Sequence, residues 1–172
     1  MIGAFRLPLT MIPLLVLLAP AAMAAPVAAP TPPAAQAALM RPLTLTKLAD
    51  MDFGNLGVTT AGTAVIDPVT NTLAVTGGVI RLGGTPHAAR FAGATSSSAV
   101  VNIKLPNRAV LLTRVGGTQT IAVDNFTLDG QSKRATAQAG VFEFNVGATL
   151  RPAANQVEGV YTGTFDVTIQ YP

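Results

Sequence analysis

The chain has 172 residues, a formal net charge of +3 and no cysteine, and only 11% of its residues are charged. The lack of cysteine excludes disulfides, thiol catalysis and cysteine-based zinc sites, so the fold must rest on its hydrophobic core. The basic residues stand singly except for Lys133-Arg134, and no aromatic residues interleave with a basic cluster. Nucleic-acid binding needs such a patch, so we do not expect it.

Residues 1–24 have the pattern of a secretory signal peptide. Arg6 precedes a largely apolar stretch of 12 residues, Leu7 to Leu18, and Ala22-Met23-Ala24 has the small-x-small pattern of a cleavage site. The run is shorter than the roughly 20 apolar residues that span a bilayer. We therefore expect export to the periplasm or cell surface, with no membrane span in the mature protein.

Residues 25–40 are rich in proline and alanine and carry no charge, which is typical of an extended linker. From Arg41 to Pro172 the sequence changes to short runs of strand-forming residues separated by turn signals. The runs, in chain order, are 42–48, 51–56, 62–67, 72–76, 79–82, 88–94, 99–106, 109–115, 118–130, 140–150 and 159–172. The sequence thus predicts one domain over residues 41–172.

Turn chemistry separates these runs. Asp67-Pro68 with Asn71, Gly77-Gly78, Gly83-Gly84 and Gly116-Gly117 are each typical of hairpin turns or strand ends. No stretch after the N-terminus has a sustained helical period. We expect an all-β fold, a β-sandwich of about 8–10 strands. The expected aromatic core is Phe53, Phe126, Phe142, Phe144, Tyr161, Phe165 and Tyr171.

The last run alternates most clearly. Its odd positions from Tyr161 to Tyr171 are aromatic, apolar or glycine, whereas the even positions from Thr162 to Gln170 are polar. A period of two indicates a strand with one buried face.

Residues that could carry catalysis are few. His87 is the single histidine, and it follows Gly83-Gly84 and Pro86 with no acid nearby in sequence, so a solvated loop histidine is expected. Asp50 and Asp52 lack the ligand spacing of a calcium loop, which favours a turn cap for Asp50 and an exposed strand position for Asp52. No constellation indicates a cofactor, a metal site or an enzyme.

Two short motifs have structural explanations. Asn125 begins Asn-Phe-Thr, a glycosylation acceptor pattern, but Phe126 is expected to face the core. The glycines around "GGVIRLGG" precede no helix, so a phosphate cradle is not expected.

Several blocks agree in order with a bacterial family of secreted proteins described only as a domain of unknown function. The blocks are "PLTLTKLADMDFGNL", "TGGVIRLGG", "VDNFTLDG", "FNVGATL" and "ANQVEGVYTGTFDVTIQY". The resemblance covers Arg41 to Pro172 and implies a class of protein rather than an activity.

The blocks "DFGNL" and "GVYTGTFDVTIQY" also resemble the spore coat protein U family and chaperone–usher pilins. Pilins are immunoglobulin-like sandwiches that lack one strand, and the resemblance implies an edge that pairs with a chaperone or a like subunit. The residues that match the pilin ending are Gly159, Tyr161, Phe165, Val167, Ile169 and Tyr171.

The sequence departs from the pilin pattern before its first strand. Prolines crowd residues 25–40 where pilins carry a donor strand, and only residues 39–48, with Leu43 and Leu45 as the inserting side chains, could take that role. An ordinary final strand in a complete sandwich therefore stays open as an explanation.

We expect a non-enzymatic, secreted structural or adhesive protein, a pilin-like subunit assembled by strand complementation. Its expected partners are a periplasmic chaperone or like subunits. The alternative is a self-complete β-sandwich module that binds a cell-surface sugar or protein. An enzyme would need a cleft that holds two or more of the scattered acids.

If the odd-numbered face of the last strand is buried, Phe165→Ala lowers the free energy of unfolding by roughly 3–5 kcal/mol. Urea denaturation measures this change. A loss below about 1 kcal/mol would mean that the opposite face points to the core.

Overall fold

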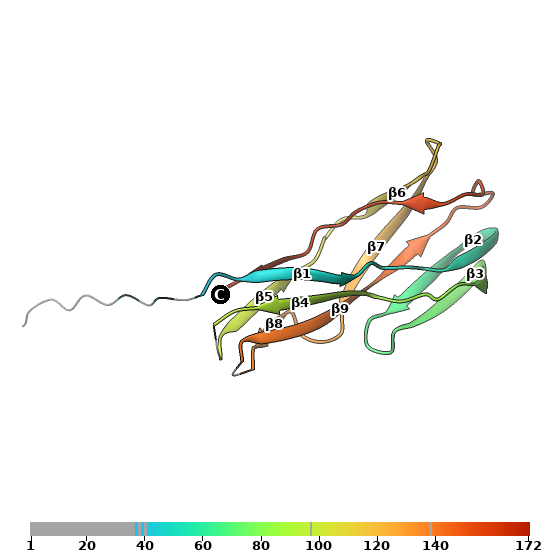
Figure 1. Cartoon of the computed structure of the whole chain (residues 1–172). Helices are drawn as coiled ribbons and strands as arrows, with labels where there is room; N and C mark the ends of the chain where they lie inside the picture. The colour runs from blue at the N-terminus through green and yellow to red at the C-terminus, as the bar shows by residue number, and fades with distance from the viewer. Residues whose placement is uncertain (1–36, 38, 40, 97, 138) are drawn as a thin grey trace, which may run out of the picture. The chain divides into compact units, whose positions relative to one another are not determined.

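The computed structural model describes residues 37, 39, 41–96, 98–137 and 139–172 (Figure 1). These residues form an all-β structure with two sheets and no helix, as the strand and turn patterns predict. Residues 38–172 make one unit and residues 1–37 another. The expected signal peptide lies outside the described residues, as does most of the linker. Among the described residues there is no helix that could cross a membrane.

The described part of the chain has eleven strands, compared with the 8–10 expected. In chain order they are β1 (Thr44–Ala49), β2 (Asn55–Asp67), β3 (Thr72–Gly83), β4 (Ala89–Ala94), β5 (Val100–Lys104), β6 (Val110–Arg114), β7 (Thr120–Leu128), β8 (Lys133–Ala135), β9 (Val141–Arg151), β10 (Tyr161–Thr162) and β11 (Thr168–Gln170).

The larger sheet is built around β9. Its order is β1-β4-β9-β7-β6-β10, and the β2–β3 hairpin joins it through β2. The first half of β9 pairs with β4, and Thr149 and Leu150 in its second half pair with β2. Every pair is antiparallel. One strand can serve two neighbours on the same side because it is eleven residues long.

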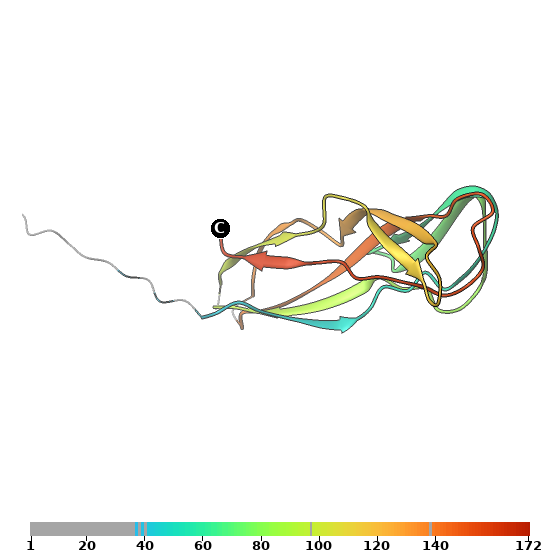
Figure 2. The ribbon, with the colours of Figure 1, turned by 90° about the horizontal axis from the view of Figure 1, so that it is seen from above.

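The smaller sheet has the order β11-β5-β8. Five links join the two sheets: β4–β5, β5–β6, β7–β8, β8–β9 and β10–β11. Figures 1 and 2 show the C-terminal segment, in red, running on from β10 into β11.

The single last strand expected from the sequence is therefore two strands. Thr162 pairs with Thr113 in the larger sheet and Thr168 pairs with Lys104 in the smaller one. Between these pairs the C-terminal segment advances six residues (162 to 168) while its partner advances nine (104 to 113). The three additional residues bulge out of the partner strand, so no continuous ladder can form there.

The core has two clusters: one is formed by strands of the larger sheet and includes Ala64, Val79 and Ile121, and the other lies between the two sheets. Phe91 of β4 and Phe144 of β9 are buried and stack with ring centroids 5.3 Å apart, and Ile103 of the smaller sheet packs in the same cluster. Phe91 was absent from the aromatic core predicted from the sequence. Phe144 is fully buried as expected, whereas the other six predicted aromatics are half-buried.

One turn prediction was wrong. Gly77-Gly78 does not end a strand, because β3 continues through it opposite a register shift between Val58 and Gly62 of β2. A Cβ atom on Gly78 would lie 2.2 Å from the Thr60 hydroxyl oxygen. Glycine at this position therefore allows β2 and β3 to approach each other closely.

The other turn signals were confirmed. Asp67 accepts hydrogen bonds from the N–H groups of Val69 and Thr70 in the β2–β3 turn, and Gly116-Gly117 joins β6 to β7.

Candidate functional site

The C-terminal segment places its odd-numbered side chains toward the core, as its alternation predicts. Phe165, Val167 and Ile169 pack against the cluster that contains Phe91 and Phe144. The Phe165 ring centroid lies 5.0 Å from that of Phe126. All three side chains nevertheless stay half-buried, whereas inward residues of β9 such as Phe144 are completely buried. The core is thus incompletely covered along this segment.

Gly159 and Tyr161, at the start of the segment, have local roles. A Cβ atom on Gly159 would lie 2.6 Å from Nε of Arg114, which donates a hydrogen bond of 2.7 Å to the Glu158 carbonyl. The Tyr161 hydroxyl donates to the Val157 carbonyl at 2.6 Å and accepts from Gln156 at 2.8 Å. These contacts hold the turn before β10, and they account for both residues within the domain.

Tyr171, at the other end, joins three segments through its hydroxyl group. It donates to the Arg41 carbonyl at 2.8 Å, so the Thr95 hydroxyl must donate to it. The Ser96 N–H donates to the same oxygen at 3.3 Å. The hydrogen bond from Thr95, followed by those from Ser96, lowers the pKa of Tyr171, although burial acts in the opposite direction. Tyr171 therefore connects the end of the chain to the residues around β1 and β4.

The strands at this end each lie at an edge. β1 stands at one end of the larger sheet and pairs with β4 alone among the described strands, and β11 stands at one end of the smaller sheet and pairs with β5 alone. The contact between Tyr171 and Arg41 places the two edges on the same side of the domain. Figures 1 and 2 show β1 and the C-terminal segment converging there. We call the free edges of β1 and β11 the open side.

Backbone polarity shows which groups of β11 face the open side. In an antiparallel ladder, successive residues direct their N–H and C=O groups to alternate neighbours. The Ile103 N–H donates to the Ser132 carbonyl, on the side of β8. Asn102 and Lys104 therefore bond to Gln170 and Thr168 of β11. The N–H and C=O groups of Ile169 consequently point to the open side.

The same argument applies to β1. The Thr95 N–H donates to the Gly140 carbonyl, toward β9, so Ala94 and Ala92 bond to Thr44 and Thr46 of β1. The backbone groups of Leu45 are left facing the open side. Leu45 and Ile169 thus present unpaired backbone groups from opposite edges, and their side chains pack against the same core cluster.

Leu45 is therefore part of its own domain. It lies in β1, opposite Gly93, and packs against the core. The prediction that residues 39–48 could serve as a donor strand with Leu43 and Leu45 inserting is not compatible with this arrangement for Leu45. The alternating residues of this segment, which the sequence suggested could be donated to another subunit, instead form β1 and pair with β4 of the same domain.

A hollow of about 470 Å³ contains His87, for which the sequence suggested no nearby acid. The fold brings Asp129 and Glu143 to the same hollow, because β4, β9 and the turn after β7 meet there. Each acid is paired: Asp129 with Arg134 at 2.6 Å and Glu143 with Arg90 at 2.5 Å. His87 uses Nδ1 with the Thr85 carbonyl at 2.7 Å. These contacts are consistent with a structural network.

Asp52 is exposed and forms an isolated β-bridge with His87, as its expected strand position predicts, but the turn cap expected of Asp50 is made by Asp52. Asp52 accepts a hydrogen bond of 2.7 Å from the Gly54 N–H and so caps the turn, whereas Asp50 pairs with Lys47 at 2.5 Å. Among the described residues, no three His, Asp or Glu side chains cluster as metal ligands would.

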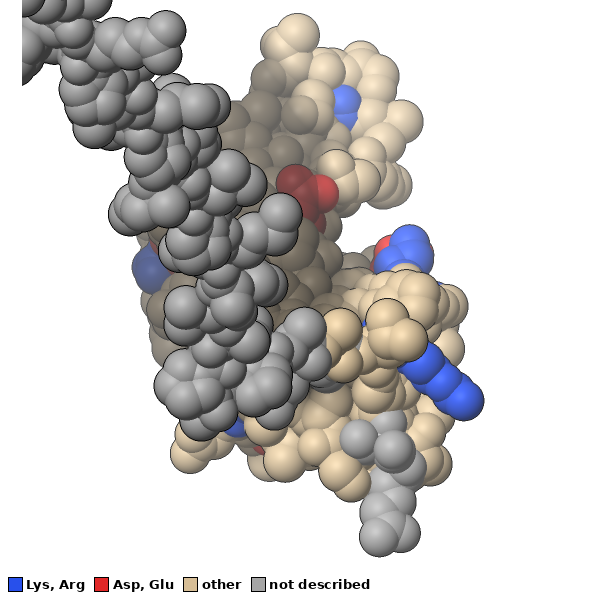
Figure 3. All heavy atoms as spheres, turned by 90° about the vertical axis from the view of Figure 1, so that its left-hand side faces the viewer, with Lys and Arg blue, Asp and Glu red and all other residues tan. Residues whose placement is uncertain are grey.

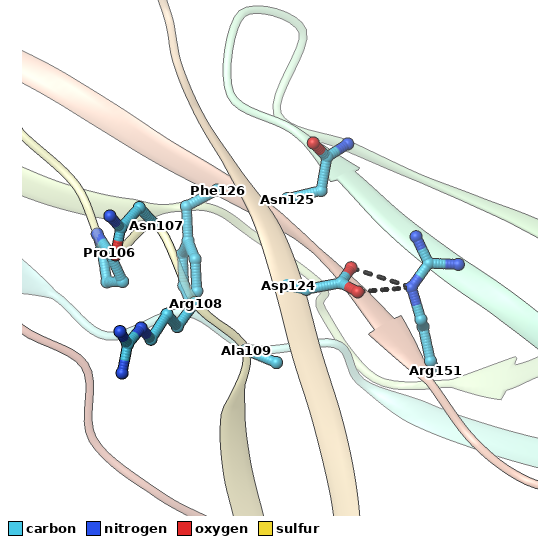
Figure 4. A pocket seen from close by; sticks show the side chains of 8 residues that line it. All are labelled: Pro106, Asn107, Arg108, Ala109, Asp124, Asn125, Phe126 and Arg151. Atoms are coloured by element: carbon cyan, nitrogen blue, oxygen red, sulfur yellow. Dashed lines mark hydrogen bonds and ion pairs between the residues drawn. The ribbon is translucent and has the colours of Figure 1, made fainter.

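A second hollow, of about 560 Å³, was not anticipated from the sequence (Figure 4). Figure 4 shows residues 106–109 and the Phe126 side chain on one side of β7, and Asp124, Asn125 and Arg151 on the other. Nε of Arg151 donates to both carboxylate oxygens of Asp124, at 2.7 and 2.9 Å. Phe126 faces the core, as its place in the strand predicted. We call this feature the bulge hollow.

The fold and the open side define an all-β, two-sheet domain with two unpaired edges on one side. The family model described as a domain of unknown function (DUF4402) matches residues 43–171, and the chain belongs to this family. This confirms the expected membership in an uncharacterised family. Comparison with curated proteins and with solved structures finds no match.

Replacing Tyr171 by phenylalanine removes the hydroxyl group that joins β11 to Arg41, Thr95 and Ser96. We expect faster hydrogen exchange at the Ser96 amide, because that N–H loses its acceptor. NMR-detected exchange measures the change. Gln170→Ala, at the exposed neighbouring position, should leave the Ser96 exchange rate unaltered. Equal rates in wild type and Tyr171→Phe would contradict this role.

Proposed function

We propose that this chain is a non-enzymatic, secreted structural or adhesive protein of the periplasm or cell surface. In this proposal its domain is an immunoglobulin-like, pilin-like sandwich that accepts an extended strand along the open side. Repeated acceptance of strands from like subunits would build a surface fibre, and a periplasmic chaperone would cover the edge beforehand.

The observation that carries the proposal is the incomplete burial of core side chains beside the open side. Phe165, Val167 and Ile169 alternate inward yet stay half-buried, next to two edges with unpaired backbone groups. A strand placed there could bond to Leu45 or Ile169 and cover the apolar side chains with its own alternating residues. Both contributions are characteristic of strand addition: the backbone provides affinity and the side-chain positions provide selectivity.

The protein also restricts access to the edge of β1. Lys47 and a register shift between Lys47 and Ala49 interrupt the second half of this strand. Edge lysines and bulges discourage indiscriminate strand pairing. The accessible part of β1 is therefore its beginning, close to Tyr171, which favours a partner that enters at a defined position.

Low surface charge supports a packed assembly. Lys, Arg, Asp and Glu make up 11% of the sequence, and the face in Figure 3 shows few charged side chains among the residues it describes. Subunits of such composition approach each other with little electrostatic repulsion.

The decisive variant is Ile169→Pro. Proline lacks the N–H that Ile169 directs to the open side, whereas Thr168 and Gln170 keep their bonds to β5. We expect the wild-type chain to form oligomers, or to bind an extended partner strand, and the variant to remain monomeric with an unaltered circular dichroism spectrum. Ile169→Ala controls for the lost side chain, because it retains the N–H group and should still associate.

Hydrogen exchange gives a second measurement. The Leu45 and Ile169 amides should exchange quickly in the free protein and become protected on assembly, whereas the Thr168 and Gln170 amides should be protected in both states. A wild-type chain that stays monomeric at all concentrations, unfolds cooperatively and shows no partner-dependent protection would refute the proposal.

A further inference from the structure

The bulge hollow lies where two neighbouring strands separate. β6 and β7 pair as far as Val110 and Val123. Toward the smaller sheet, residues 105–109 then leave the side of β7, while β7 continues along β9. The hollow of about 560 Å³ occupies the resulting gap, within the size range of small-ligand sites.

A β-bulge in β7 lies beside this gap and contributes residues to the lining of the hollow. Asp124 pairs with Thr149 and Thr127 with Gly147, so β7 has one more residue than β9 between these pairs. Asn125 has φ of +51°, a left-handed conformation that is unusual for a residue other than glycine. Before the bulge, the residues of β7 that face the core have odd numbers, Ile121 and Val123. After it they have even numbers, Phe126 and Leu128. Bulges of this kind redirect side chains and are frequent beside functional sites.

The hollow contains more positive than negative charge. Both carboxylate oxygens of Asp124 are occupied by Nε of Arg151, and the terminal nitrogens of that guanidinium make no hydrogen bond to the described residues. Arg108, on the opposite wall, also has no ion pair or hydrogen bond within the described part of the chain. Figure 4 shows the Arg108 side chain directed away from Arg151, so each guanidinium offers donors on its own wall, and the planar geometry of either one matches a carboxylate.

The remaining lining suits a polyhydroxylated ligand. The side-chain amides of Asn107 and Asn125 each carry both donors and acceptors, which hydroxyl groups require. Phe126 contributes an apolar surface for C–H groups. A simple anion would use only the arginines. From this combination we infer that the bulge hollow is a binding site for an acidic monosaccharide unit, a sugar that bears a carboxylate.

This site is separate from strand addition. Its lining residues come from the link between β5 and β6, from β7 and from the end of β9, and include none of β1 or β11. Failure of strand complementation would leave it intact, and the converse also holds. In an adhesive protein it would provide contact with acidic polysaccharide.

The test is an NMR titration of the whole chain with D-glucuronic acid, with D-glucose and acetate as matched probes. We expect saturable shifts at the Asn107, Asn125 and Arg151 amides with glucuronate, and much weaker responses to glucose and to acetate. Arg108→Gln should weaken glucuronate binding about tenfold or more, since it removes charged hydrogen bonds. Arg81→Gln, an exposed arginine outside the hollow, should leave the affinity unaltered.

Three results would overturn the inference. The first is the absence of saturable shifts in the bulge hollow with glucuronate. The second is an equal response to acetate, which would show that the sugar ring is not recognised. The third is equal weakening by Arg108→Gln and Arg81→Gln, which would show that net charge alone attracts the ligand. Circular dichroism verifies that each variant is folded.

Discussion

Backbone pairing of β9 is the constraint on which the rest of the domain depends. Its eleven residues pair with β4, β2 and β7, so three parts of the chain distant in sequence share one ladder. Residues 146–150 are buried consecutively, since strands flank β9 and Ile66 and Pro68 approach Gly147 closely. A hydrogen-bonded strand at the centre is costly to disrupt, because its buried polar groups would lose their partners.

From this centre the two sides of the domain differ. Toward β8, the link after β7 crosses between the sheets, and Arg134 contacts Asp129 while its guanidinium lies 5.9 Å from the Phe144 ring centroid. At the β1 and β11 edges, the β10–β11 link joins the sheets, and the Tyr171 hydroxyl adds hydrogen bonds to Arg41, Thr95 and Ser96. Because β1 and β11 are edge strands, no further described strand covers the C-terminal segment, and its inward side chains stay half-buried.

Irregular strands provide the distinguishing features of the molecule. Three additional residues between β5 and β6 break the last strand into two, and one additional residue in β7 redirects Asp124 and Asn125. Both irregularities meet at the bulge hollow. Regular pairing builds the core, whereas the departures from it create the surfaces available for recognition.

The fold class, the inward face of the last segment and most turns could be predicted from the amino-acid sequence. These properties follow from local rules: a period of two, and the preference of Asp, Asn and glycine for particular backbone conformations. The continuity of β3 through Gly77-Gly78 and the burial of Phe91 were missed, because the partner strands decide them.

Three features could be read only from the folded chain: where the sheets separate, which acids surround His87, and which backbone groups of Leu45 and Ile169 remain unpaired. Each depends on register between segments far apart in the chain, and register is a property of the assembled ladder that no single segment contains.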